Sequence, residues 1–159
     1  MRPADLPDVS RVAGVVHPLY PESDAIFAER LRLYPAGSRV LIEEADAVQG
    51  YVVSHPWIRG AIPALDSLLG TLPPAADSYY IHDIALLPQA RGCGAAQDCI
   101  AILADHAARA HFARMSIVAI AGTQAFWERQ GFRVVDLPSL TAKLASYDPS
   151  ARYMERLLN

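Results

Sequence analysis

The chain has 159 residues, enough to bury the core of one domain. Apolar residues make up 52% of it and charged residues 19%, a balance that excludes a disordered chain. The net charge of -3 excludes a strongly basic protein, so we expect no nucleic-acid partner. We therefore expect a single globular domain that covers residues 1–159.

The cysteine content and the apolar runs exclude several further classes. Cys93 and Cys99 lack the second pair that a disulfide framework or a zinc site needs, so we expect no metal and a reducing, cytoplasmic location. Residues 1–10 carry charges and no continuous apolar run, so we expect no signal peptide. No apolar run is long enough to cross a bilayer, so we expect no membrane partner.

Two helices are predicted at the start of the chain. Apolar residues recur at three- and four-residue spacing in residues 7–16, which is typical of a helix with one buried face. His17 and Pro18 end this helix. Ser23 then provides an N-cap for a second amphipathic helix that runs until Pro35.

A β-hairpin is predicted next. Residues 38–45 and 48–55 are both rich in β-branched and apolar side chains, and a short turn around Asp46 separates them. Residues 56–77 form an unusually long connection that contains several prolines and many apolar residues. Two interpretations stay open for it, a functional loop or a short helix packed on the core.

The rest of the chain alternates between strands and helices, which predicts a mixed α/β (α+β) sheet with helices on both faces. The apolar patterns predict a strand, a helix, a strand, a helix and two strands, in residues 78–87, 95–109, 115–121, 123–130, 132–137 and 151–158.

A glycine turn joins the third predicted strand to the long helix. A helix that starts directly after a strand points its first N–H groups at one place, which is typical of an anion site. Gly92 and Gly94 would let the backbone approach a ligand and adopt positive φ, and Arg91 adds a positive charge. The turn lacks the lysine of a Walker loop, and Gln97 replaces the third glycine of a dinucleotide fingerprint. A tight strand-to-helix corner without a ligand stays open.

The motif "QARGCG" in residues 89–94 resembles the Gln/Arg-x-x-Gly-x-Gly/Ala loop of the GNAT superfamily, the coenzyme A-dependent N-acyltransferases. The segments "RPADLPDV", "DIALLP" and "AFWERQGF" resemble the family's opening, its fourth strand, and the helix and strand after its fifth strand. Their order and spacing match along nearly the whole chain. The resemblance implies a GNAT-like mixed central sheet in which the fourth and fifth strands splay apart.

The resemblance also implies how acetyl-coenzyme A would bind. Its pyrophosphate would contact the amides of the glycine turn, and its pantetheine arm would extend like an added strand beside a bulge. Cys93 would contribute its backbone, because no neighbouring base would activate its thiol. The cofactor-binding residues implied in this way are Ile84, Ala85, Leu86, Gln89, Arg91, Gly92, Cys93, Gly94, Ala95, Ala96, Ala121, Phe126 and Trp127.

Two residues are candidates for the base that deprotonates the attacking amine. His82 titrates near neutrality and would border the thioester, although a histidine in an apolar strand is often a hydrogen-bonded core residue. Asp83 is the second candidate catalytic residue, and strand alternation places it on the opposite face, where it would orient a partner or meet the substrate ammonium. The backbone N–H of Leu86 would stabilise the oxyanion.

The chain departs from the family pattern at two positions. Trp127 stands where many members have a tyrosine that protonates the leaving thiolate, and an indole N–H is not an acid at ordinary pH. Ile120 stands where many have an asparagine that bonds the pantetheine arm. The thiolate would leave unaided, or another residue such as Tyr147 or Tyr153 would protonate it, although tyrosines near strand ends more often pack.

We therefore expect an N-acetyltransferase that moves an acetyl group from acetyl-CoA to a primary amine of a small molecule or peptide. The alternative is a coenzyme A-binding module with weak or no catalysis and a sensory or structural role. A third reading is an interaction domain that uses the loop of residues 56–77 and binds no cofactor. The acceptor and the oligomeric state stay open, and the resemblance is compatible with a homodimer.

Overall fold

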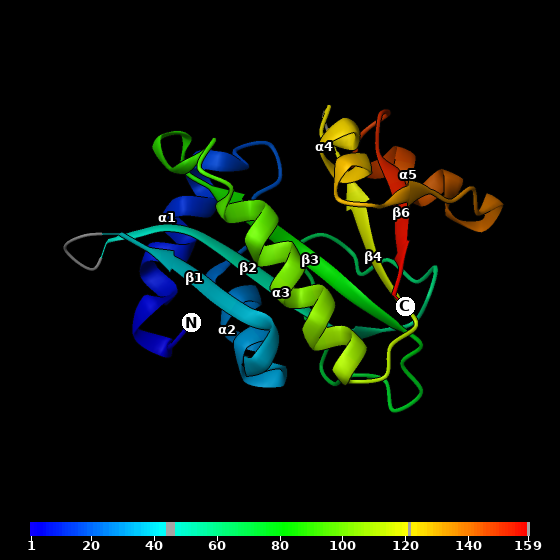
Figure 1. The fold of residues 1–159 in the computed structure, drawn as a ribbon, viewed down its shortest axis with the longest axis horizontal. Helices are drawn as coiled ribbons and strands as arrows, with labels where there is room; N and C mark the ends of the chain where they lie inside the picture. The colour runs from blue at the N-terminus through cyan, green and yellow to red at the C-terminus, as the bar shows by residue number, and fades with distance from the viewer. Residues whose placement is uncertain (44–46, 121, 159) are drawn as a thin grey trace. The chain divides into compact units, whose positions relative to one another are not determined.

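The computed structural model describes residues 1–43, 47–120 and 122–158 (Figure 1). Its residues form two compact units, each assembled from segments that are separate in the sequence. The first unit consists of Met1–His55, Ala64–Leu72 and Ile81–Cys99, and the second of Pro56–Pro63, Pro73–Tyr80 and Ile100–Asn159. That residues 1–159 form one domain stays a prediction.

The helices of the described residues agree closely with the sequence analysis, with one addition. They are α1 (Leu6–Val16), α2 (Asp24–Leu33), α3 (Ala95–Arg109), α4 (Gln124–Arg129) and α5 (Thr141–Tyr147). The first four confirm predicted helices to within about one residue at each end. We did not predict α5, although Leu140 and Leu144 have the four-residue spacing of a helix.

The strands form one mixed sheet in the order β1-β2-β3-β4-β6-β5. They are β1 (Ser38–Ile42), β2 (Val48–Trp57), β3 (Ser78–Leu86), β4 (Arg114–Ala119), β5 (Arg133–Val134) and β6 (Arg152–Leu157). The antiparallel pairing of β1 with β2 confirms the predicted hairpin, while the turn around Asp46 lies outside the described residues. The mixed α/β fold class is confirmed.

β5 is much shorter than predicted. β5 has two residues where we predicted residues 132–137, because the chain turns into a 3-10 helix that starts at Pro138. β3 and β4 pair in parallel through Tyr79 with Met115 and Tyr80 with Ser116, both within the second unit. The predicted splay of these strands concerns the placement of the two units and stays a prediction.

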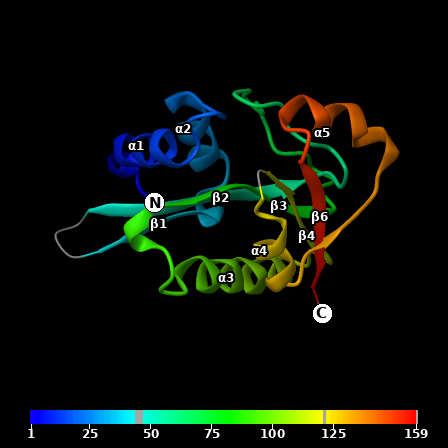
Figure 2. The same ribbon diagram turned by 90° about the horizontal axis from the view of Figure 1, so that it is seen from above.

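The core of the first unit lies between the first two helices and the strands. In this unit α1 and α2 cover one face of β1 and β2 (Figure 2). The Phe27 ring meets the Tyr51 ring edge-on, with 5.5 Å between the ring centroids. This packing holds α2 against β2. The buried residues of this core are Val9, Val12, Phe27, Val48, Tyr51, Val53, Ala85 and Leu87.

The core of the second unit contains the aromatic residues near the carboxyl end of the chain. Trp127 packs edge-on against Phe126 and Phe132, with 5.2 Å between the ring centroids in each case. The hydroxyl of Tyr153, a residue that is 1% exposed, accepts the backbone N–H of Gly60 at 3.0 Å. These aromatic side chains are structural members of the core.

The long connection after β2 contains no helix, so the short-helix interpretation is wrong. Residues 58–77 are irregular, and Asp66 has a φ of 49°, which disfavours a right-handed helix. In the first unit α2 holds this loop through its side chains. Glu29 accepts the N–H groups of Leu69 and Gly70 at 2.7 and 2.9 Å, and Arg30 Nη2 donates to the carbonyl of Ser67 at 3.0 Å.

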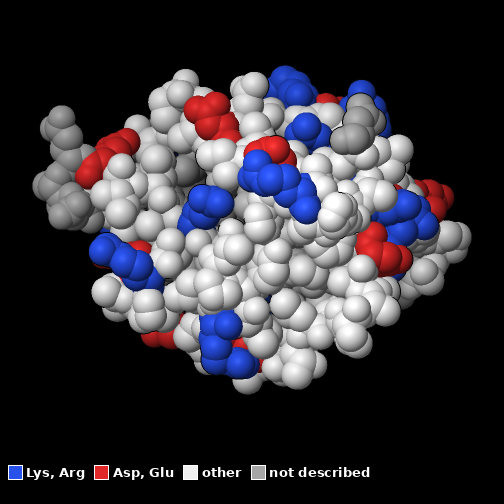
Figure 3. All heavy atoms as spheres, turned by 60° about the horizontal axis from the view of Figure 1, so that its bottom comes forward, with Lys and Arg blue, Asp and Glu red and all other residues white. Residues whose placement is uncertain are grey.

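The surface carries mixed charge. On the face drawn in Figure 3, basic and acidic side chains are interspersed among a majority of other residues. Among the described residues, no helix has both the length and the apolar character that a bilayer-spanning segment needs. That nucleic acids are not partners stays a prediction.

Candidate active site

Two histidine–carboxylate pairs lie in the first unit, where the connection between α1 and α2 meets β3. The connection contributes His17 and Glu22, and β3 contributes His82 and Asp83. His17 occupies this place because α1 ends there, where the backbone leaves the helical region with φ -121° and ψ 52°. Each pair joins one residue of the connection to one residue of the strand.

The first pair consists of Glu22 and His82. Glu22 Oε2 lies 2.9 Å from His82 Nε2, and the two side chains are 7% and 8% exposed. An ionised carboxylate only accepts hydrogen bonds, so with Glu22 ionised the donor of this bond is Nε2 of His82. The other oxygen of Glu22 accepts the backbone N–H of Asp66 at 3.2 Å. Glu22 thus connects the loop after β2 to His82.

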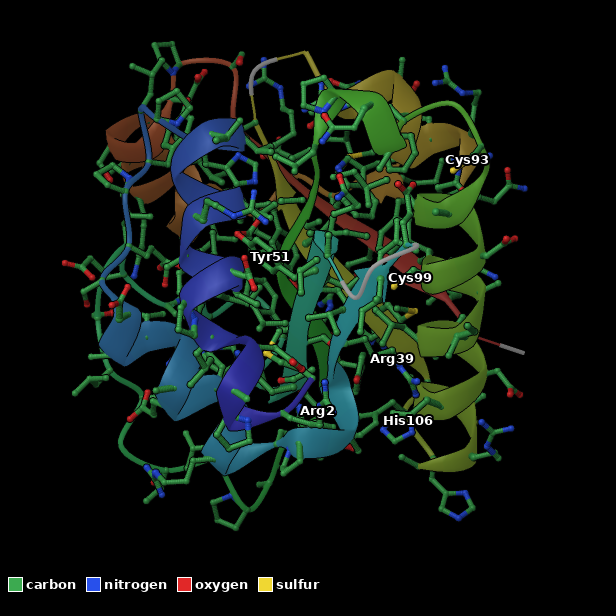
Figure 4. The ribbon with its side chains drawn as sticks, turned by 90° about the vertical axis from the view of Figure 1, so that its left-hand side faces the viewer. Arg2, Arg39, Tyr51, Cys93, Cys99 and His106 are labelled. Carbon is green, nitrogen blue, oxygen red and sulfur yellow. The ribbon has the colours of Figure 1, made fainter. Side chains whose placement is uncertain are left out.

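The second pair extends into a chain of three side chains. His17 Nε2 lies 3.0 Å from Asp83 Oδ1, and these side chains are 22% and 20% exposed. The Tyr51 hydroxyl, from β2, donates to the other oxygen of Asp83. Figure 4 shows Tyr51 beside α1, in agreement with its place in the core of this unit. Both oxygens of Asp83 are therefore engaged.

The pKa values of this chain shift in directions that keep the pair charged. Burial opposes the charged form of His17, but the hydrogen bond and charge of Asp83 outweigh it and raise the pKa of His17. Burial likewise opposes ionisation of Asp83, but the hydrogen bonds and charge of its partners lower its pKa. Burial and the charge of Asp83 raise the pKa of Tyr51 well above its ordinary value, so its hydroxyl stays a donor.

The expectation that His82 and Asp83 lie on opposite faces of β3 stays a prediction. Both side chains bind residues of the same connection, His82 to Glu22 and Asp83 to His17. These two contacts bring both candidate residues to one site.

The glycine turn has the geometry of an anion cradle. Gly92 and Gly94 have φ of 83° and 89°, and no atom of the described residues beyond the chain neighbours lies within 4 Å of a Cβ built on either. Arg91 is exposed, and its Nε donates to the carbonyl of Leu86 at 3.0 Å, which fixes its charge beside the turn. Since α3 starts directly afterwards at Ala95, the turn fits a diphosphate group such as that of coenzyme A.

The sequence pattern of the acetyltransferase (GNAT) family matches residues 9–132. The chain belongs to the GNAT acetyltransferase family. The match includes both histidine–carboxylate pairs and the glycine turn. No curated protein sequence is similar enough to this chain to count as a match.

Solved GNAT structures share this fold at low sequence identity. Ard1 from Thermoplasma volcanium superposes with a TM-score of 0.73 and 18% identity, over 100% of this chain and 95% of its own. The GNAT-like decarboxylase GphF in complex with isobutyryl-CoA gives 0.77 and 17%, over 100% and 97%. The ribosomal-protein-S18-alanine N-acetyltransferase from Escherichia coli gives 0.68 and 16%, over 100% and 91%.

The other predicted cofactor residues of the first unit lie on or beside the turn. Ala85 is buried in the core, which leaves its backbone for a ligand, while Ile84, Leu86, Ala95 and Ala96 are half-buried. The exposed Gln89 side chain donates to that of Gln49 at 2.7 Å. Their contacts with a GNAT cosubstrate stay predictions.

The two cysteines occupy different surroundings near the start of α3 (Figure 4). Cys93 is exposed in the turn, and its Sγ donates to the carbonyl of Ala90 at 3.3 Å. Burial raises the pKa of the Cys99 thiol to about 11, so this thiol stays protonated. Neither arrangement activates a nucleophile.

Two of the predicted cofactor residues, Phe126 and Trp127, lie in the second unit. Trp127 is 4% exposed and packed against its aromatic neighbours, and Phe126 is half-buried. Ala121 lies outside the described residues, as does the side chain of Tyr147. That these residues line a cofactor or donate a proton stays a prediction.

Sequence reasoning missed three residues of the site, His17, Glu22 and Tyr51. His17 could have been recognised, because it stands before a proline at the end of the helix that opens this family. We interpreted it solely as the end of that helix. Glu22 and Tyr51 gave none, since their roles follow from partners distant in the sequence. Among the described residues, no group of three or more metal-ligating side chains could hold a metal ion.

Proposed function

We propose that the protein is an N-acetyltransferase that moves an acetyl group from acetyl-CoA to a primary amine of a small molecule or peptide by direct attack. The observation that carries this proposal is the Glu22–His82 pair. His82 lies on β3, the strand that leads into the open glycine turn. Membership of the GNAT family supports it. The S18-alanine N-acetyltransferase, which has the same fold, gives further support.

Acetyl-CoA supplies the acyl group as an activated thioester. The N–H groups of the turn around Gly92 and Gly94 would hold its diphosphate, with Arg91 beside them. The backbone from Ile84 to Leu86 would bind the pantetheine arm in the manner of an added strand. The N–H of Leu86 remains our proposal for the group that stabilises the oxyanion.

His82 is the proposed base. An alkyl ammonium has a pKa of about 10.4, so a base must take its proton before the amine can attack. Nδ1 of His82 would accept that proton, and Glu22 on Nε2 would stabilise the imidazolium that forms. Asp83 suits this role less well, because His17 and Tyr51 already occupy its two oxygens.

The surroundings of Glu22 favour an acceptor amine that carries an apolar group. Asp66 accepts the backbone N–H of Ser23 at 2.8 Å, which ties the loop to the connection before α2. Both segments expose leucines next to these contacts. The exposed leucines are Leu19 at 81%, Leu65 at 41% and Leu68 at 61%. Exposed apolar side chains at a site of this kind would bind the apolar part of an acceptor.

One observation favours a second candidate function, a coenzyme A-binding module with weak or no catalysis. Trp127 replaces the family's proton donor, and its ring is packed in the core of the second unit. Under this alternative the turn would bind coenzyme A for a sensory or structural purpose.

The experiment is a screen of amines with the purified protein and acetyl-CoA. The panel contains alkyl amines of increasing length, polyamines, amino acids and short peptides, with thiol release as the first readout and mass of the acetylated amine as the second. We expect amine-dependent thiol release that is fastest for amines with an apolar group. A thermal shift with coenzyme A but no turnover would favour the module, and no shift with either nucleotide would contradict both.

A further inference from the structure

Hydrogen bonds in both directions join the loop after β2 to the connection before α2. Asp66 Oδ1 accepts the backbone N–H of Ser23 at 2.8 Å, and the backbone N–H of Asp66 donates to Glu22 Oε1 at 3.2 Å. The other oxygen of Glu22 lies 2.9 Å from His82 Nε2. Asp66 therefore holds both the carboxylate that binds His82 and the backbone next to that carboxylate.

We propose that Asp66 is a positioning residue that fixes the Glu22 carboxylate on His82. This inference rests on the proposed acetyl transfer, in which His82 is the base. The loop after β2 would then have two tasks, since its exposed leucines would bind the acceptor while Asp66 orients the base through Glu22.

The backbone of Asp66 supports this role. Its φ is 49°, in the left-handed region that residues other than glycine seldom adopt. Among the residues that the structure describes, His111 is the only other non-glycine residue with positive φ. Such a conformation costs free energy, so it persists where surrounding contacts hold it. Here those contacts are the hydrogen bonds with Ser23 and Glu22, and in this conformation the N–H of Asp66 reaches the Glu22 carboxylate.

Glu22 needs such support because its own segment is irregular. It lies between α1 and α2, where no strand or helix fixes its backbone. The loop on the other side of the contact is held from α2, where the buried Glu29 and Arg30 bind the backbone of residues 67–70. The residues that follow Asp66 are thus fixed, and Asp66 joins Glu22 to this fixed segment.

The hydrogen bonds of Asp66 suit orientation better than stability. Asp66 is exposed, so its hydrogen bonds compete with water and add little to the stability of the fold. The hydrogen bonds from Ser23 lower the pKa of Asp66, so its carboxylate is charged at neutral pH. Glu22 and His82 are 7% and 8% exposed, so their geometry depends on protein contacts more than on water. We therefore expect the loss of Asp66 to lower turnover much more than stability.

The test compares two variants at Asp66 in steady-state kinetics. Asp66→Gly keeps the left-handed conformation and removes the acceptor for Ser23. We expect kcat to fall about tenfold, within the cost of misplacing a catalytic group, with KM for acetyl-CoA within about twofold. Asp66→Asn keeps an acceptor oxygen and tolerates the same conformation, so its kcat should stay within about threefold of the parent protein. An equal loss of kcat in both variants would overturn the proposal.

The double variant with Glu22→Gln separates positioning from other effects of the substitution. If Asp66 acts through the charge of Glu22, Asp66→Gly should slow the Glu22→Gln protein by less than about twofold, because the carboxylate that it positions is already gone. A further loss of about tenfold in that background would mean that Asp66 acts independently of Glu22, contrary to the proposal.

A matched control removes the same kind of hydrogen bond in the second unit. Asp77 is also exposed, and its Oδ1 accepts the backbone N–H of Arg59 at 2.7 Å. We expect Asp77→Gly to change thermal stability about as much as Asp66→Gly does, while its kcat stays that of the parent protein. A loss of kcat as large as that of Asp66→Gly would reveal a general effect of loosened loops and argue against the proposal.

Nitrogen NMR of the His82 ring supplies a readout that needs no turnover, because the chemical shifts of the ring nitrogens respond to the hydrogen bond with Glu22. We expect Asp66→Asn to keep the shifts of the parent protein, and Asp66→Gly to move them toward those of Glu22→Gln. Identical ring shifts in Asp66→Gly and the parent protein would overturn the proposal. Inactivity of the parent protein with every amine would instead refute the proposed function, and the ring shifts would then decide alone whether Asp66 fixes Glu22.

Discussion

The two units use buried carboxylates in different ways. In the first unit Glu22 and Asp83 each bind a histidine. In the second unit Glu155, whose side chain is 6% exposed, binds two arginines, Arg59 Nε at 2.8 Å and Arg114 Nη1 at 3.2 Å. Glu22 is 7% exposed and so as buried as Glu155, while Asp83 is 20% exposed, so the clearest difference lies in their partners.

The partner decides what a buried carboxylate can do. Arginine stays protonated at every pH at which the protein is folded, so a carboxylate bound to it holds a fixed charge in place. Histidine changes charge near neutrality, so a carboxylate bound to it can support the gain or loss of a proton. The contrast assigns structure to the Glu155 cluster and proton transfer to the Glu22–His82 pair of the first unit.

The largest effect that would test this contrast is expected at Glu155. Glu155→Gln leaves Arg59 and Arg114, which are 38% and 28% exposed, without their shared negative partner. We expect the free energy of unfolding to fall by about 3 kcal/mol, the upper end for hydrogen bonds to a charged group. Urea titration would measure the loss. Acetyl transfer per folded molecule should be unchanged, and a specific loss of turnover without a loss of stability would break the comparison.

Glu22→Gln should lower turnover rather than stability. The amide keeps an oxygen for the N–H of Asp66 but loses the charge that stabilises protonated His82. We expect kcat to fall about 10- to 100-fold, part of the contribution of a general base, with KM for acetyl-CoA within about twofold. Steady-state kinetics would measure both constants, with the exposed Glu43→Gln as control. A change confined to KM would argue for a binding role.

Asp83→Asn should lower stability by an amount that depends on pH. Because the pKa of His17 is raised in the folded protein, its interaction with Asp83 contributes most below the ordinary histidine pKa of about 6.5 and is lost as pH rises through the raised value. We expect a deficit of about 2 kcal/mol near pH 6 that shrinks as pH rises through the raised pKa of His17. Unfolding free energies of both proteins across this range would measure it. A deficit that grows with pH would contradict the charged pair.

The smallest effect is expected at the turn. Gly92→Ala places a Cβ on a residue with φ 83°, which costs about 1 kcal/mol and shifts the backbone that would hold the diphosphate. We expect the affinity for acetyl-CoA to fall about fivefold to tenfold, and calorimetry would measure it. The exposed Gly14→Ala in α1 is the control, and it should bind normally. Unchanged binding by Gly92→Ala would argue for a turn without a ligand.

The sequence was informative wherever local rules determine structure. The glycine turn and α3 followed from residue types and spacing within a short segment, and so did the hairpin of β1 and β2. His82 and Asp83 were named because they stand on the strand before that turn. Local periodicity and motif spacing are visible in a single sequence, and these elements depend on little else.

What the sequence did not reveal depends on contacts between distant segments. Glu22 is 60 residues from His82, and no local pattern links the two. The contacts of Asp83 with His17 and Tyr51 likewise join residues that are distant in the sequence. Of the two interpretations of the loop after β2, the short helix was wrong, because its apolar residues suggested packing while its anchors on Glu29 come from another element.

The most direct test of proton transfer in the first unit is the turnover of His82→Gln at saturating acetyl-CoA and the best amine of the screen. Glutamine keeps a donor for Glu22 but cannot accept a proton. We expect kcat to fall at least about 100-fold, the lower bound for loss of a general base, while calorimetry detects unchanged affinity for acetyl-CoA. Turnover within about threefold of the parent protein would contradict the assignment of His82 as the base.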